Sequence, residues 1–242
     1  MNDLDLTGKV ALVTGASRGI GRSIALALAA SGATVVASAR VSEHLDDVVR
    51  EIEAMDVETL AIPADLAQDE QIRNLFDTIE QTYGKLDICI NNAGIGHFGP
   101  VIDFSLDDFD AVMAVNVRGT FLCCQAAMQM MVPCKSGYII NVSSVVGTRG
   151  YANQSAYTAS KHGIMGLTKS LAVEAQPHNI RVSAILPGGV DTDMARASRP
   201  DLPTDELLAP DDVAQSVLFL LSLSERAAID EIYIRRKNSK PF

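Results

Sequence analysis

Three side chains in the second half of the chain are of the types that proton transfer at a carbonyl oxygen requires. Tyr157 and Lys161 stand four residues apart in a segment with helical periodicity, so they share one face of the predicted helix. Ser144 precedes Tyr157 by 13 residues and follows an apolar run typical of a buried strand. A carbonyl oxygen that becomes an alcohol needs a proton and a hydrogen-bond donor, which a phenol and a hydroxyl supply.

The Tyr157 phenol needs assistance near pH 7, because a free phenol has a pKa of about 10. A cation on the same helix face, in a site shielded from water, lowers that pKa. We therefore predict Tyr157 as the acid/base, Lys161 as the cation that tunes it, and Ser144 as the donor to the carbonyl oxygen. Ser143 competes with Ser144, but neighbours in an extended segment point to opposite sides, and we expect Ser144 to face the phenol.

A glycine-rich turn near the N-terminus predicts a second kind of site. Residues 14–21 (TGASRGIG) lie between the apolar run Val10–Val13 and an alanine-rich segment with helical spacing. Glycines at such a turn let a phosphate approach a helix N-terminus, where free N–H groups favour anions. The spacing is G-x3-G-x-G instead of G-x-G-x-x-G, so a tight strand-to-helix turn without a ligand remains the alternative.

The residue after the second apolar run indicates which dinucleotide would bind. Sites for NAD tend to place a carboxylate there, but this chain has Arg40 and no carboxylate before Glu43. The planar guanidinium donates twice to phosphate oxygens, and Arg18 in the glycine turn is near enough in sequence to contribute. The sequence therefore predicts NADP(H) in preference to NAD(H), with solvated surface arginines as the alternative.

Composition and charge exclude several classes of protein. The 242 residues are 48% apolar and carry a net charge of −10, which argues against a disordered chain and against a nucleic-acid partner. No run of 18 uncharged apolar residues and no export signal is present, so we expect no membrane span and a cytoplasmic location. The four cysteines lack zinc-ligand spacing, so no metal site is predicted. The one basic cluster is interpreted as a solvated end, and it consists of Arg235, Arg236, Lys237 and Lys240.

Apolar runs alternate with helical patterns along the whole chain. Strands are predicted at residues 10–13, 33–39, 57–62, 86–90, 138–142, 180–186 and 229–234, with helices at 42–55, 68–83, 104–131, 154–175 and 211–223. This order predicts an α/β fold, a doubly wound parallel sheet of Rossmann type with helices on both faces, formed by one domain over residues 1–242. Ligands of such sheets bind beyond the carboxyl ends of the strands. The polar segment 188–210 is predicted to be a loop that covers the substrate.

An ordered set of motifs resembles the short-chain dehydrogenase/reductase family from about Thr7 to Leu223. The motifs are Thr14–Gly21, Asn91–Gly94, Asn116, Asn141–Ser144, Tyr157–Lys161 and the Pro187-Gly188 pair. The resemblance implies that Ser144, Tyr157 and Lys161 are catalytic. It further implies that Asn116 holds a water linking Lys161 to solvent, although a polar residue that bends the helix is the alternative.

The resemblance also implies a set of cofactor-binding residues. These are Gly15, Ser17, Arg18, Gly19, Ile20, Gly21, Arg40, Asp65, Leu66, Asn92, Ala93, Gly94, Tyr157, Lys161, Pro187, Gly188, Val190 and Thr192. Asp65 would bind the adenine amine, and Thr192 would help to hold the carboxamide. Each of these two is also of a type that caps a turn or helix.

Within the family, residues 16–22, 144–147 and 191–194 are similar to 3-oxoacyl-acyl-carrier-protein reductases. This similarity implies a small carbonyl or alcohol substrate, with 3-oxoacyl thioesters among the candidates, and a homo-oligomer. Those reductases end in a glycine-bearing strand, whereas residues 228–235 lack glycine, so the family's tetramer or a dimer through the two long helices is expected. Arg196 and Arg199 would either contact a phosphopantetheine group or be solvated. An NAD-linked alcohol dehydrogenase and a non-catalytic dinucleotide-binding regulator remain the alternative functions.

Overall fold

The computed structural model describes residues 4–40, 43–198 and 203–240. Within these ranges the strands are β1 (Val10–Thr14), β2 (Thr34–Ala39), β3 (Thr59–Pro63), β4 (Ile88–Asn91), β5 (Gly137–Val142), β6 (Ile180–Pro187) and β7 (Glu231–Ile234). The helices are α1 (Gly19–Ala30), α2 (Glu43–Glu53), α3 (Asp69–Tyr83), α4 (Leu106–Met113), α5 (Thr120–Cys134), α6 (Ser155–Ala175), α7 (Asp193–Ser198) and α8 (Pro210–Leu221). The predicted α/β alternation is confirmed.

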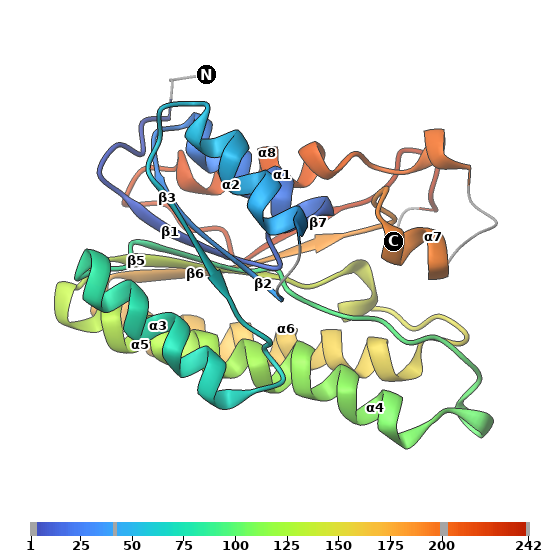
Figure 1. Cartoon of the computed structure of the whole chain (residues 1–242). Coiled ribbons are helices and arrows are strands. Elements are labelled where there is room, and N and C mark those ends of the chain that lie inside the picture. The colour runs from blue at the N-terminus through green and yellow to red at the C-terminus, as the bar shows by residue number, and fades with distance from the viewer. Residues whose placement is uncertain (1–3, 41–42, 199–202, 241–242) are drawn as a thin grey trace.

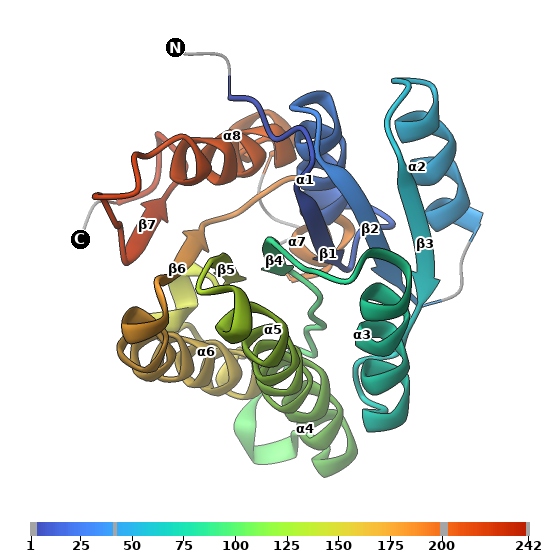
Figure 2. The same ribbon diagram turned by 90° about the vertical axis from the view of Figure 1, so that its left-hand side faces the viewer.

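The described strands form one parallel sheet in the order β3-β2-β1-β4-β5-β6-β7. Helices α1, α2 and α8 cover one face, and α3, α5 and α6 cover the other (Figures 1 and 2). Side chains alternate between the two faces along β1: Ala11 and Val13 join the first core, while Val10 and Leu12 join the second. The fold is therefore the predicted doubly wound sheet with a hydrophobic core on each face.

The direction of winding reverses between β1 and β4, which are neighbours in the sheet although β2 and β3 intervene in sequence. A crevice forms at such a switch point, beyond the carboxyl ends of the two strands. The glycine-rich turn leaves β1 at this place, and Asn92 follows β4 there. The topology thus brings two of the predicted motifs together before any side chain is considered.

Two predicted segments differ from the structure in a way that concerns the site. The helix expected over residues 104–131 is α4, a π-helical turn (Ala114–Gly119) and α5, and Ser105 caps its start through the Asp108 N–H. The segment 188–210, predicted as a loop, contains α7 and a 3-10 turn at Thr204–Glu206. The third strand begins at Thr59, two residues later than predicted, and residue 42, the predicted start of the second helix, lies outside the described residues.

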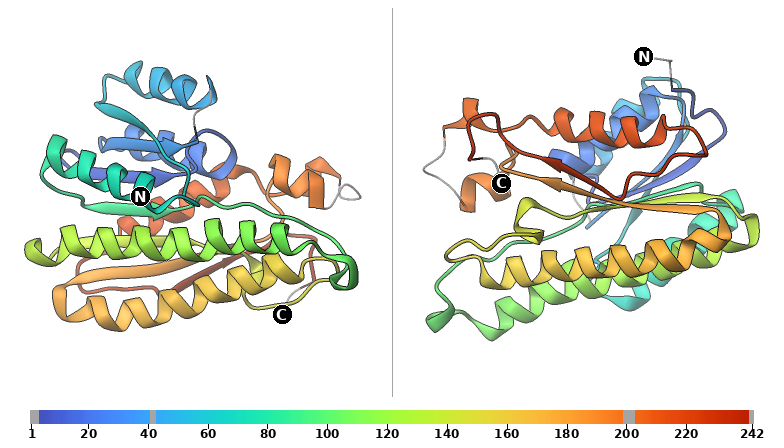
Figure 3. Two further views of the ribbon diagram at one scale, coloured as in Figure 1. Left: turned by 60° about the horizontal axis from the view of Figure 1, so that its bottom comes forward. Right: turned by 180° about the vertical axis from the view of Figure 1, so that it is seen from behind.

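The run Leu106–Cys134 is, among the described residues, the one helical run that is long and apolar enough to cross a bilayer. The criterion of 18 uncharged apolar residues does not select this run, because charged residues such as Arg118 interrupt it. In the fold this run lies beside α6 on one face of the sheet, and α5 also packs against α3 (Figures 2 and 3). Length and composition alone are weak grounds for a membrane span, since a core helix has the same properties.

Candidate active site

The predicted catalytic side chains meet beyond the carboxyl end of β5. Ser144 follows that strand. Its hydroxyl accepts from the Val146 N–H, and its one proton can be donated either to the Pro187 carbonyl, 3.3 Å away, or to the Tyr157 phenol oxygen. Ser143 is buried instead, and its hydroxyl donates to the Lys161 carbonyl inside α6. The two serines thus point to opposite sides, and the one beside the phenol is Ser144.

Removal from water is the largest influence on the pKa values of Tyr157 and Lys161, the two predicted catalytic residues of α6. It raises the pKa of the Tyr157 phenol to about 12, although the hydrogen bond with Ser144 opposes this shift. The expected lowering of the phenol pKa is therefore wrong for this protein environment. One physical reason is that the Lys161 ammonium donates to the Val142 carbonyl at 2.9 Å and lies 5.7 Å from the centre of the Tyr157 ring.

Lys161 is itself almost fully buried, with 5% of its surface exposed. Removal from water disfavours the ammonium, and the pKa of Lys161 falls to about 8. Tyr157 and Lys161 thus both hold their protons at neutral pH, and Lys161 is the group of the pair that titrates nearer to it.

The Asn116 amide is fully engaged by protein groups. Its oxygen accepts from the Ile95 N–H at 2.8 Å, and its nitrogen donates to the Ile95 carbonyl and to the Ser160 hydroxyl at 2.9 and 3.0 Å. The π-helical turn thereby holds the segment after β4 against α6. Gly94 lies between Asn116 and Lys161: a Cβ there would stand 3.3 Å from the amide oxygen and 3.6 Å from Nζ. These contacts are consistent with the alternative in which Asn116 is a structural residue at the bend of the helix. Its role in holding a water between Lys161 and solvent stays a prediction.

A large cavity of about 870 Å³ opens beside these groups. It is lined by the glycine-rich turn and by residues that follow β2, β3 and β4, and it reaches Tyr157 and Lys161. The predicted cofactor residues on its wall are Gly15, Ser17, Arg18, Gly19, Ile20, Gly21, Arg40, Asp65, Leu66, Asn92, Ala93, Gly94, Tyr157, Lys161 and Thr192. The remaining three, Pro187, Gly188 and Val190, line a neighbouring cavity instead.

The glycine-rich turn brings its backbone segments so close together that side chains are excluded. A Cβ on Gly21 would lie 2.1 Å from the Gly15 carbonyl oxygen, and Gly15 itself has a φ of +66°. The Asn92 amide fixes the turn by donating to the carbonyl oxygens of Thr14 and Gly15 at 2.9 and 3.2 Å. Helix α1 begins here with neither a side-chain cap nor an acidic residue in its first turn, which leaves N–H donors for an anion.

Gly21→Ala is therefore expected to abolish measurable binding of NADPH and of NADH, because the methyl group would force the turn out of shape. The measurement is isothermal titration calorimetry of each cofactor, with circular dichroism as the check of folding. Gly166→Ala is the matched control, since a Cβ there has no atom within 4 Å. A folded Gly21→Ala protein with wild-type affinity would contradict the fit of the turn to a phosphate.

Two arginines predicted to bind a 2′-phosphate are placed differently. Arg40 lies on the wall of the large cavity, at the end of β2. Arg18 also lines it, but its guanidinium pairs with Asp193 of α7 at 2.9 Å, and both side chains are about two-thirds exposed (66% and 67%). The glycine turn is thus connected to the segment that follows β6.

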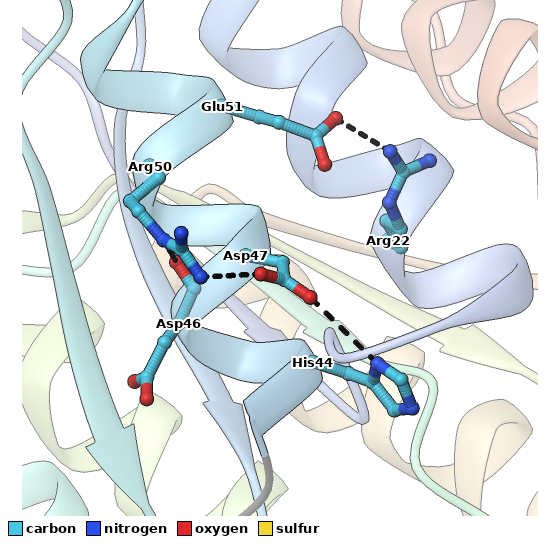
Figure 4. A network of polar contacts seen from close by, with 6 residues as sticks. All are labelled: Arg22, His44, Asp46, Asp47, Arg50 and Glu51. Atoms are coloured by element: carbon cyan, nitrogen blue, oxygen red, sulfur yellow. Dashed lines mark hydrogen bonds and ion pairs between the residues drawn. The ribbon is translucent and has the colours of Figure 1, made fainter.

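Helix α2, which follows Arg40 in sequence, is joined to α1 by one ion pair. Glu51 pairs with Arg22 of α1, while Asp47 pairs with His44 and Arg50 within α2 (Figure 4). His44 also lines the large cavity. The network therefore fixes the helix that borders the cavity at the Arg40 end.

Asp65 and Thr192 both line the cavity and both act as caps. The Asp65 carboxylate accepts from the Ala67 N–H at 3.0 Å, and the Thr192 hydroxyl accepts from the Ala195 N–H at 3.3 Å. Their proposed contacts with adenine and carboxamide remain predictions. Arg196 is engaged by Asp191 at 2.8 Å, and Arg199 lies outside the described residues.

A second cavity of about 640 Å³ adjoins the first and shares Tyr157 and Thr192 with it. Ser144 lines the second cavity, so the hydroxyl pair stands where the two meet. The interpretation of the basic tail as a solvated end is wrong for Arg235 and Arg236, which are half-buried and form part of this wall, whereas Lys240 borders the same cavity and is exposed. The topology contained the missed signal: β7 is parallel to β6, so residues after it emerge at the ligand-binding edge.

Comparison with known proteins agrees with the geometry. The sequence model described as short chain dehydrogenase matches residues 9–203. The 3-oxoacyl-acyl-carrier-protein reductase of Thermotoga maritima is 37% identical over 225 residues, which are 90% of this chain and 92% of that protein. The reductase of the same name from Synechocystis sp. is 39% identical over 221 residues, covering 89% and 90%.

A crystal structure of a metagenomic short-chain oxidoreductase in complex with NADP is similar over 97% of this chain and 99% of its own, with a TM-score of 0.85 and 36% identity. Similarity in sequence and in fold thus extends over almost the whole chain. The chain belongs to the short-chain dehydrogenase family and is an NAD(P)-dependent oxidoreductase.

Proposed function

We propose that this protein transfers hydride between NADP(H) and a carbonyl or alcohol substrate, with Ser144, Tyr157 and Lys161 as its catalytic residues. The observation that carries the proposal is the position of Ser144 and the Tyr157 phenol where two cavities adjoin. One cavity has the glycine-rich turn of a dinucleotide site, and the other is open to a small molecule. A substrate carbonyl at the junction is within the reach of both hydroxyl groups.

The nicotinamide cofactor supplies or accepts the hydride, and the protein handles the proton. In the reducing direction the Tyr157 phenol, protonated at neutral pH, donates its proton to the substrate oxygen. Ser144 donates a hydrogen bond to the same oxygen as its negative charge develops. The Lys161 ammonium, held by the Val142 carbonyl 5.7 Å from the centre of the Tyr157 ring, would have to leave that carbonyl to stabilise the phenolate that Tyr157 leaves behind. Asn116 keeps α6 in position by its bonds to Ile95 and Ser160.

Preference for NADP(H) is supported by Arg18 and Arg40 on the wall of the large cavity and by the NADP complex of a relative. Arg40→Ala is expected to weaken NADPH binding by about 10- to 100-fold, the loss of one or two charge-assisted hydrogen bonds, with little effect on NADH. Calorimetric titration with both cofactors is the test, and Arg226→Ala, an exposed site outside both cavities, is the control. Equal losses for NADPH and NADH would contradict this role of Arg40, and tighter binding of NADH than of NADPH to the wild type would support an NAD-linked alcohol dehydrogenase instead.

A 3-oxoacyl thioester is a candidate substrate because the similar proteins of Thermotoga and Synechocystis carry that reductase name. A screen that follows cofactor absorbance at 340 nm with acetoacetyl thioesters, ketones, diketones and steroids tests the whole proposal. Absence of turnover with every compound, despite tight NADPH binding, would favour a non-catalytic regulator.

We further propose one domain, a cytoplasmic location and a homo-oligomer. The oligomer is supported by large apolar side chains exposed on the two long helical runs: Phe121 of α5 is 48% exposed and Val173 of α6 is 72% exposed. The two runs lie side by side (Figure 3), so a dimer through them would bury both side chains. Light scattering of the purified protein distinguishes such a dimer from the tetramer of the family.

A further inference from the structure

The wall of the second cavity has a charge opposite to that of the protein. The chain as a whole has 30 acidic and 20 basic residues. Among the described residues that line this cavity, however, none is acidic and four are basic, namely Arg149, Arg235, Arg236 and Lys240. An acidic protein repels anions at long range, so local cations are what would bring an anionic molecule into this cavity.

Two of the four basic residues, Arg235 and Arg236, are engaged in contacts that stabilise the wall of the second cavity. The Arg235 guanidinium donates to the carbonyl oxygens of Arg236, Lys237 and Ser239, at 3.2, 3.3 and 2.9 Å, and so folds the tail into a turn. Arg236 has only 14% of its side chain exposed and pairs at 3.4 Å with Glu206 of the 3-10 turn Thr204–Glu206. These contacts hold the C-terminal tail against that turn.

The other two cations are the ones positioned to bind a ligand. Arg149 lies over the Tyr233 ring, 5.5 Å from its centre, and no carboxylate of the described chain forms an ion pair with it. A cation–π contact uses none of the guanidinium N–H donors, so they remain available to a carboxylate or phosphate, which can bind with two hydrogen bonds. Lys240 adds a flexible ammonium to the same wall, with no ion pair to the described residues.

Ser144 and Tyr157 line the same cavity, so a molecule that fills it would contact both hydroxyl groups and the cationic wall. We infer that the natural substrate is an anionic carbonyl or hydroxy compound, whose carboxylate or phosphate binds Arg149 and Lys240 while its carbonyl group faces Ser144 and Tyr157. This inference rests on the proposed function and specifies the class of substrate. Specificity for charge would then come from residues outside the catalytic motifs.

Matched pairs of compounds test the inference with the protein saturated with NADP⁺, so that binding is measured without turnover. The pairs are 4-oxopentanoate with its methyl ester, for the carboxylate, and dihydroxyacetone phosphate with dihydroxyacetone, for the phosphate. In at least one pair the anion should bind about 10- to 100-fold more tightly by calorimetry, and raising the salt concentration should weaken it. Equal or weaker binding of the anion in both pairs overturns the inference.

Substitutions of Arg149 and Lys240 test whether the preference for the anion comes from the basic wall of the second cavity. Arg149→Gln and Lys240→Gln should each reduce the preference for the anion by about tenfold or more and leave the neutral partner unchanged. Lys237→Gln is the matched control, because Lys237 belongs to the same tail but does not line the cavity. An undiminished preference in Arg149→Gln and Lys240→Gln would also overturn the inference. Turnover of neutral ketones with no preference for anions would leave the proposed function intact, whereas the proposed function fails only if no carbonyl compound is turned over.

Discussion

Tyr157→Phe is expected to lower kcat by about 100- to 10,000-fold, the range that a positioned general acid contributes. The phenol is half-buried, and its raised pKa means that it keeps its proton until the substrate oxygen accepts it. Phenylalanine keeps the ring and its edge contact with Phe98, whose ring centre is 5.7 Å away. NADPH affinity should therefore change by no more than about tenfold, because one neutral hydrogen bond at most is lost. Steady-state turnover and calorimetric titration measure the two quantities.

Tyr83→Phe is the matched control, since it removes a phenol at the end of α3, far from both cavities. Its turnover should equal that of the wild type. If Tyr157→Phe retained normal turnover, the assignment of the acid/base would be wrong and another proton donor would have to be found near Ser144.

Lys161→Met is expected to change how stability depends on pH. The lowered pKa of Lys161, about 8, means that the unfolded chain holds this proton more tightly than the native protein does. The native state therefore carries a penalty below pH 8 that disappears as the pH rises toward the unfolded value. Between pH 7.5 and 9.5 the wild type should gain about 2 kcal/mol of unfolding free energy relative to the variant. Urea denaturation at several pH values provides the measurement.

Lys169→Met serves as the control for this pH effect. Lys169 lies on the same helix, but 68% of its side chain is exposed, so its charge stays in water when the protein folds. The difference in stability between Lys169→Met and the wild type should be the same at both pH values. If the free energies of unfolding of the wild type and of Lys161→Met changed in parallel with pH, burial would not lower the pKa of Lys161.

The sequence predicted the parts of the site that depend on local spacing and strand order. Tyr157 and Lys161 share a face because α6 is a regular helix through them, and Ser144 was distinguished from Ser143 by the alternation of an extended segment. The glycine turn was predictable because a buried strand and an alanine-rich helix flank it. Each inference needs only a short stretch of chain, which is why it could be made without coordinates.

Features that depend on long-range contacts were missed. The pairing of Arg18 with Asp193 joins residues 175 apart in sequence, and nothing local predicts it. The phenol pKa went the opposite way to the prediction because burial depends on the whole fold, and because the Val142 carbonyl engages the Lys161 ammonium. The role of the basic tail in lining a cavity followed from the parallel pairing of β7, a consequence of topology that composition did not reveal.

The contact between Arg18 and Asp193 makes two properties of the protein depend on each other. An exposed ion pair of this kind is worth about 0.2–1 kcal/mol, so an anion that draws Arg18 away from Asp193 weakens the attachment of α7 to the glycine turn by that amount. Thermodynamic reciprocity requires the converse. An ion pair that fixes α7 against the glycine turn lowers the affinity of the turn for that anion by the same factor, up to roughly fivefold. Charge-neutralising substitutions at Asp193 therefore offer a way to tune phosphate affinity from outside the phosphate site.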